Sequence, residues 1–228
     1  MIDTLSASTQ LDDLLSSRYS CRGYLPDEVP DEVIRRVFEM AQKTASWCNT
    51  QPWQVTVTRG DATRRFAAAL TDYARANPPR ADLDVPAGYH GVYSDRRRES
   101  GFALYASLGI ARDDRAARDA QAAKNFDFFG APHTAVITTD REQGVYGAID
   151  CGGYISTLML AARAAGLASV AQASVALYSD AVRAHFGLGE DRLVVCAVSF
   201  GFEDPAHPAN SFRTTRATVA DAVEIRSE

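Results

Sequence analysis

The feature that most constrains the fold is an apolar segment that runs from Ile149 to Gly166. Its apolar residues would fall on most faces of a helix, and Gly166 is typical of the glycine that ends one. Such a helix cannot expose its whole surface to water, because burial of apolar area is the main favourable contribution to folding. We therefore expect it in the protein core or at an interface between subunits.

Helical and strand patterns alternate around this segment. Helices are predicted where apolar residues recur every three or four positions, and strands where short β-branched runs stand between turn residues. The predicted helices are one capped by Ser8 or Thr9 that ends near Arg18, and those at residues 31–44, 61–73 (capped by Asp61), 102–108, 113–124 and 180–186. The predicted strands are residues 54–58, 134–139, 168–173 and 193–198.

The chain of 228 residues shows no repeat, linker or low-complexity block, so we predict one α+β domain over residues 1–228. Residues 77–110 begin with a long stretch rich in proline and glycine. Loops of that length in a compact domain are often functional, and we interpret this region as a possible substrate lid. Residues 202–228 lack periodicity apart from a weak helix near Val219, and we expect them to form a C-terminal arm.

The overall charge and the cysteines exclude several classes of protein. A net charge of -5 argues against nucleic acid as the main partner. The strongly apolar run Ile155 to Ala165 is interrupted by Arg163, and it is too short and too polar for a membrane span. No secretory signal or metal-ligand spacing is visible, and the widely spaced cysteines are typical of reduced thiols: Cys21, Cys48, Cys151 and Cys196. We therefore expect a cytoplasmic protein without a metal site.

Two polar clusters flank the helix predicted at residues 31–44. The first runs from Arg18 to Arg22, and the second is a turn that contains Asn49 and Gln51. Arginine and hydroxyl groups are the donors that a phosphate needs, and a late arginine could add to them. Turn amides can bind the polar edge of a planar ligand. Either cluster alone would more often be an ordinary loop, so the pair carries the hypothesis.

The order of these motifs resembles that of the FMN-dependent nitroreductase family. The resemblance rests on Arg18-Tyr19-Ser20-x-Arg22, Ser46-x-x-Asn49-x-Gln51-Pro52-Trp53, Gly166 to Ser169, Val198 to Gly201 and Arg216. Within the family, Asn125 to His133 and Asp150 to Gly153 are similar to bacterial nitrobenzoate or nitroaromatic reductases. The resemblance implies a nitroreductase-like fold, in which helices flank a central, mostly antiparallel sheet, and an obligate intertwined homodimer.

The resemblance also implies which residues bind FMN at the subunit interface. Arg18, Tyr19, Ser20 and Arg22 match positions around the phosphate, the ribityl chain and the N1–O2 edge of the ring. The other expected FMN-binding residues are Ser46, Trp47 and Cys48 from the partner subunit, Asn49 and Gln51, Gln172, Ala173 and Ser174, and Arg213 and Arg216. No side chain is expected to act as an acid or base, because flavin N5 carries the chemistry and Arg22 tunes it.

By the same resemblance, the protein would be an oxidoreductase that uses NADPH or NADH to reduce nitroaromatic or related electron-poor acceptors. The mechanism would be ping-pong hydride transfer through flavin N5. The candidate substrate residues lie in the possible lid: Tyr89, Tyr93, Arg97, Phe102 and Tyr105. The alternatives are another reductive flavoenzyme of the same fold, such as a dehalogenase or an enone reductase, and a flavin-binding protein without turnover.

Overall fold

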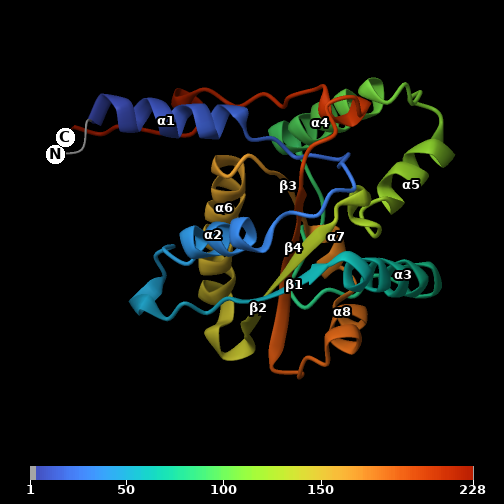
Figure 1. Cartoon of the computed structure of the whole chain (residues 1–228). Coiled ribbons are helices and arrows are strands. Elements are labelled where there is room, and N and C mark those ends of the chain that lie inside the picture. The colour runs from blue at the N-terminus through green and yellow to red at the C-terminus, as the bar shows by residue number, and fades with distance from the viewer. Residues whose placement is uncertain (1–3, 228) are drawn as a thin grey trace.

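A four-stranded antiparallel sheet forms the centre of the protein, in the order β1-β2-β4-β3 (Figure 1). The computed structural model describes residues 4–227. The strands are β1 (Gln54–Arg59), β2 (His133–Asp140), β3 (Ala168–Gln172) and β4 (Arg192–Gly201). All four predicted strands are confirmed, as are the α+β class and the antiparallel sheet. The main differences are that β4 continues beyond Val198 and that β3 ends before Ala173.

Helices cover both faces of the sheet, which is why nearly every side chain of the inner strands β2 and β4 is buried. Helices α2 (Asp31–Ala41) and α6 (Gly144–Ala164) pack on one face. Helices α3 (Gly60–Ala76), α7 (Ala173–Ala176) and α8 (Ser179–Phe186) lie on the other face, at the right of Figure 1. Each face therefore has its own apolar core, and the sheet separates the two.

Helix α6 contains the apolar segment of the sequence, and it lies in the core as predicted, with Tyr154 and Leu158 buried. It begins at Gly144 rather than at Ile149. By length and composition alone, the helical segment Arg141–Ala164 could cross a membrane. Its apolar character therefore begins earlier in the chain than the sequence pattern indicated. Its packing on β2, β3 and β4 is that of a core helix.

Three further helices lie outside these two layers: α1 (Thr4–Ser17), α4 (Gly91–Ser107) and α5 (Arg115–Ala123). The prediction that Ser8 or Thr9 caps the first helix is wrong, because both hydroxyls donate to the Leu5 carbonyl inside α1. Asp61 likewise lies in the first turn of α3 rather than at its N-cap, which is Arg59. Single 3-10 turns complete the chain: η1 (Trp47–Asn49), η2 (Phe128–Gly130), η3 (Arg141–Gln143), η4 (Pro208–Asn210) and η5 (Val219–Asp221).

The region predicted as a lid has two parts. Residues 77–90 have no regular structure, and α4 follows them directly. None of the residues of α4 is buried, which is unusual for a helix of 17 residues. The C-terminal arm is irregular, and its predicted weak helix is only the 3-10 turn η5.

Candidate functional site

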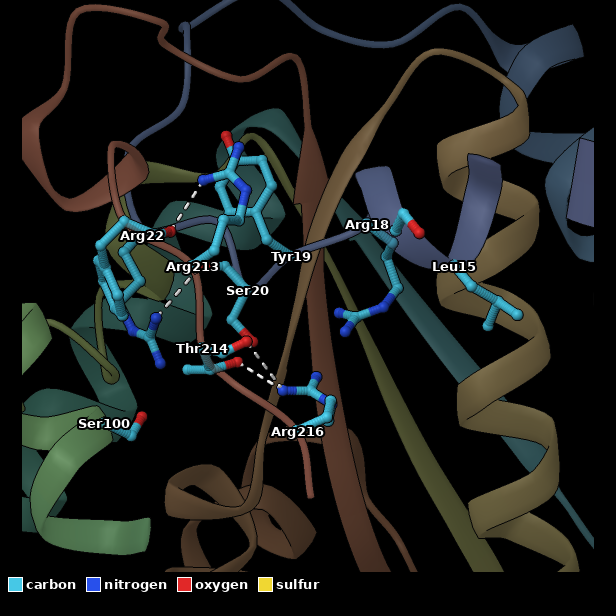
Figure 2. A pocket seen from close by; sticks show the side chains of 11 residues that line it. Leu15, Arg18, Tyr19, Ser20, Arg22, Ser100, Arg213, Thr214 and Arg216 are labelled. Atoms are coloured by element: carbon cyan, nitrogen blue, oxygen red, sulfur yellow. Dashed lines mark hydrogen bonds between the residues drawn. The ribbon is translucent and has the colours of Figure 1, made fainter. Parts of the chain in front are cut away.

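A cavity of about 470 Å³ lies between the end of α1, the loop that follows it and the C-terminal arm (Figure 2). Four arginines line it, from two segments almost 200 residues apart in the chain: Arg18 and Arg22, and Arg213 and Arg216. The other lining residues are Leu15, Ser16, Tyr19, Ser20, Ser100, Phe212 and Thr214. The structure therefore brings together the first polar cluster and the late arginines.

The loop from Ser20 to Arg22 is fixed by backbone contacts to elements far away in the sequence. Ser20 forms a parallel bridge with Ser169 of β3, where the Cys21 N–H donates to the Ser169 carbonyl at 3.1 Å. The Arg22 N–H donates to Oδ1 of Asn210 at 2.9 Å. Asn210 is buried, and its Nδ2 donates to the Gly23 carbonyl at 2.8 Å. This one amide thus ties the arm to the loop.

Arg213 and Tyr19 contact each other directly. The Arg213 guanidinium lies 3.7 Å from the centroid of the Tyr19 ring, within the range of a cation–π interaction. The Tyr19 hydroxyl donates to Glu203 at 2.7 Å. Burial, followed by this hydrogen bond, raises the pKa of the Tyr19 phenol. Since the Tyr19 hydroxyl already has a partner in the chain, Tyr19 is suited to shaping the cavity rather than to binding a ligand through its phenol.

Arg18 and Arg216 extend toward each other in Figure 2, and they repel. Burial lowers the pKa of the Arg18 guanidinium, and the Arg216 charge lowers it further. Arg216 donates to Thr214 Oγ1 at 2.7 Å and to the Thr215 carbonyl at 2.8 Å, both of which are neutral acceptors.

Positive charge in this cavity is not compensated by the protein. No carboxylate among residues 4–227 lines the cavity, and none of the four arginines forms an ion pair there. Burial also lowers the pKa of the Arg22 guanidinium, whose Nη1 donates to the Ser20 carbonyl at 3.1 Å. Clustered guanidinium groups with hydroxyl donors are the chemistry of a phosphate site, and the cavity fits the phosphate of a cofactor such as FMN.

The second polar cluster lies elsewhere, in the turn between α2 and β1. None of Ser46, Trp47, Cys48, Asn49 and Gln51 lines the arginine cavity of its own chain. The turn is held by its own contacts, because the Ser46 hydroxyl accepts from the Gln51 N–H at 2.9 Å. The backbone has positive φ at Cys48, Asn49 and Gln51, a conformation that costs energy in residues other than glycine.

The predicted residues at the end of β3 divide into a buried and an accessible part. The Gln172 side chain is 2% exposed, donates to the Asn125 carbonyl at 2.8 Å, and accepts from the Ser199 hydroxyl. This side chain is therefore engaged within the protein, whereas the resemblance implies a contact through backbone N–H groups of residues 172–174. Ala173 is exposed and Ser174 half-buried, at the start of α7.

The five candidate substrate residues do not form one site. Arg97 is exposed on α4, and its guanidinium lies 5.4 Å from the centroid of the Tyr89 ring, which precedes the helix. Tyr93 is 67% exposed. Phe102 and Tyr105 instead line a separate hollow of about 310 Å³ with Arg112.

Sequence reasoning missed several residues of the cavity: Leu15, Ser16, Ser100, Phe212 and Thr214. Thr214 stands between two arginines that were singled out, so the sequence RTTR carried a usable signal. Ser100 comes from α4, and nothing in its local sequence distinguishes it. No cluster of three or more potential metal ligands lies among the described residues.

Comparison with known proteins extends over nearly the whole chain. The family model described as "Nitroreductase family" matches residues 15–202. Nitroreductase NfnB of Mycolicibacterium smegmatis is 37% identical over 223 residues, which cover 97% of this chain and 95% of that protein. A 4-nitrobenzoate reductase of Nocardioides sp. is 35% identical, with coverage of 94% and 89%.

Similarity to solved structures is equally extensive. The crystal structure of the FMN-dependent nitroreductase NfnB from Mycobacterium smegmatis in complex with NADPH superposes with a TM-score of 0.92. The two chains are 37% identical, and the match covers 96% of this chain and 99% of that one. On its sequence and its fold, the chain belongs to the nitroreductase family.

Proposed function

We propose that the protein is an FMN-dependent NAD(P)H oxidoreductase that reduces nitroaromatic compounds. The observation that carries this proposal is the arginine cavity, whose positive charge no carboxylate of the described chain balances. When bound, FMN supplies the two-electron exchange between NAD(P)H and the acceptor. Relatives named for nitro compounds favour such acceptors over halides or enones, the alternatives within the same fold.

In this proposal the residues of the cavity have different tasks. Arg18, Ser20 and Arg216 bind the FMN phosphate, and Arg22 supplies positive charge beside the flavin ring. Arg213 helps to hold the phosphate and packs on Tyr19. The chain thus contributes binding, orientation and electrostatics, and no side chain serves as a proton donor or acceptor.

The proposed active protein is a homodimer in which each subunit completes the other's site. On α6, Val145 is 69% exposed, Tyr146 53% and Ile149 60%. Trp47, 57% exposed, packs edge-on against Tyr146 with ring centroids 4.2 Å apart. Exposed apolar patches of this kind mark protein contacts, and here they adjoin the turn that does not reach the cavity of its own chain. Ser46, Trp47 and Cys48 would then contact the partner's FMN, and Asn49 and Gln51 lie beside them.

Two further assignments belong to the proposal. Residues 77–110 form the substrate lid, with the exposed rings of Tyr89 and Tyr93 available to cover a flat acceptor. The protein acts in the cytoplasm, since all four cysteines are free, as expected for thiols in a reducing compartment.

Replacing Ile149 by aspartate should convert the dimer into monomers, because a carboxylate would be buried in an apolar interface without a partner. Sedimentation at a fixed protein concentration measures the effect, and FMN content should fall with the dimer. Ala69→Asp is the control, since Ala69 is exposed on α3, on the opposite face of the sheet. A dimer that survives Ile149→Asp unchanged would place the interface elsewhere.

An absorption spectrum of the purified protein, taken before and after anaerobic addition of NADPH or NADH, tests the proposed function. We expect flavin bands that bleach on addition of a donor and return on addition of nitrobenzoate. Bands that persist would indicate a flavin-binding protein without turnover. A colourless protein that FMN cannot reconstitute would contradict the proposal altogether.

A further inference from the structure

A second cavity, of about 650 Å³, adjoins the first between α4 and the C-terminal arm. Its lining is Arg96, Glu99, Ser100, Ala103, Arg213, Thr214, Thr215, Arg216 and Ala217, of which Ser100, Arg213, Thr214 and Arg216 also line the first cavity. The two parts of its wall are joined directly, because the Thr215 hydroxyl donates to Glu99 at 3.0 Å. Its volume lies within the range of small-molecule sites.

Together the two cavities hold more positive charge than one phosphate can balance. Among the described residues, Glu99 is the single carboxylate that lines either cavity. Five arginines line them: Arg18, Arg22, Arg96, Arg213 and Arg216. A phosphate monoester carries a charge of about −1.5 to −2 at neutral pH. The chain as a whole is nevertheless acidic, with a net charge of -5. The surplus therefore points to a second anionic group in the same region.

Arg96 is the residue most available to that second group. Its guanidinium donates no hydrogen bond to any described residue and forms no ion pair with one. Its charge acts on the Asp221 carboxylate without forming an ion pair, and that carboxylate already accepts from the Thr218 hydroxyl at 2.8 Å. The neighbouring arginines differ, since Arg97 stacks on Tyr89 and Arg98 donates to Ser94 at 3.4 Å. Neither of them lines the cavity.

We infer that the second cavity binds the 2′-phosphate of NADPH, and that Arg96 sets the preference for NADPH over NADH. The inference rests on the proposed function, because a nicotinamide donor must bind beside the flavin that it reduces. NADPH differs from NADH only by this phosphate, and arginine binds such a group with bidentate, charge-assisted hydrogen bonds. A carboxylate on the aromatic acceptor has related chemistry and is distinguished by the experiment.

The test compares Arg96→Gln with Arg98→Gln, an exposed arginine two positions along α4 that does not line the cavity. With Arg96→Gln, the ratio of the KM for NADPH to the KM for NADH should rise roughly tenfold, the effect of losing one charge-assisted hydrogen bond. A readout free of turnover is calorimetric titration of the FMN-loaded protein with adenosine 2′,5′-bisphosphate and with AMP. The original protein should bind the bisphosphate more tightly, and Arg96→Gln should remove that difference while Arg98→Gln retains it.

Several outcomes would overturn the inference. Equal loss of NADPH and NADH affinity, equal effects of the two substitutions, or equal binding of bisphosphate and AMP would each do so. A change confined to the KM for nitrobenzoate would assign the cavity to the acceptor instead. All of these leave flavin reduction intact, whereas an original protein whose flavin neither donor bleaches would contradict the proposed function itself.

Discussion

Arg216→Gln is expected to weaken FMN binding roughly 10- to 100-fold, which is the effect of losing one charge-assisted hydrogen bond to the phosphate. The same substitution should leave the FMN-free protein as stable as before, or make it more stable. The reason is that Arg216 repels Arg18 and lowers the pKa of its guanidinium, and neither side chain forms an ion pair in the described chain. A residue that costs stability in the free protein is one retained for its ligand.

The two effects are measured separately. FMN affinity comes from fluorescence titration of the FMN-free protein, and stability from thermal unfolding of that same preparation at constant protein concentration. Arg226→Gln is the control, because Arg226 lies in the same arm, pairs with Glu224 at 2.9 Å and lies outside the cavity. An FMN-free Arg216→Gln protein that melts several degrees lower would mean that Arg216 is structural, and unchanged FMN affinity would remove the phosphate from this cavity.

Local pattern was sufficient for the elements that carry their own apolar periodicity, such as β4 and α2. It failed at the start of α6, where Gly144 and Gly147 have low intrinsic helix propensity. Gly147 is there for packing, because a Cβ at this position would come within 2.5 Å of the Gln143 side chain and 2.8 Å of the Thr139 hydroxyl. It failed at α1 because a serine or threonine hydroxyl can satisfy a carbonyl inside a helix as well as cap one.

The candidate site was predictable as a set of residue types but not as a place. Arg18 and Arg216 were identified by motif, whereas their mutual repulsion arises only because the fold brings the two ends of the chain together. Asn210, which holds the loop and the arm together, carried no local signal. The turn at Asn49 and Gln51 shows the converse case. Its sequence was informative, and its distance from the arginine cavity is what the proposed homodimer would explain.

Asp82, inside the region predicted as a lid, is another residue whose contacts could not be predicted from the local sequence. Its carboxylate accepts from Arg183 Nη2 at 2.7 Å, from Arg183 Nη1 at 3.2 Å and from the Val194 N–H at 2.8 Å. Both side chains of this ion pair are only 9% exposed. A proline-rich loop gives no sign of such a contact, yet it fixes the first part of residues 77–110 to the core. Any movement of the proposed lid would therefore arise after this anchor.

Asp82→Asn is expected to lower the free energy of unfolding by about 3 kcal/mol at neutral pH, because it leaves a buried guanidinium without its main partner. The value lies at the low end for buried pairs, since Asp180 and Glu190 lie 3.5 and 3.9 Å from Arg183. Urea unfolding at constant protein and FMN concentration measures it. Asp72→Asn is the matched control, because the Asp72–Arg75 pair is exposed, and a change within about 0.5 kcal/mol is expected there.

The pH dependence of the free energy of unfolding distinguishes the contribution of the Asp82 charge from that of its packing. Burial raises the pKa of this carboxyl, but the hydrogen bonds from Arg183 and Val194 outweigh burial, and the net pKa is lowered. A group with a lowered pKa in the folded state adds stability above its ordinary pKa and loses it as the pH falls through the folded value. The difference between the original protein and Asp82→Asn should therefore be constant from about pH 7 to pH 5 and shrink below about pH 4. A difference that stays constant down to pH 3 would show that the carboxylate acts by packing, with no contribution from its charge.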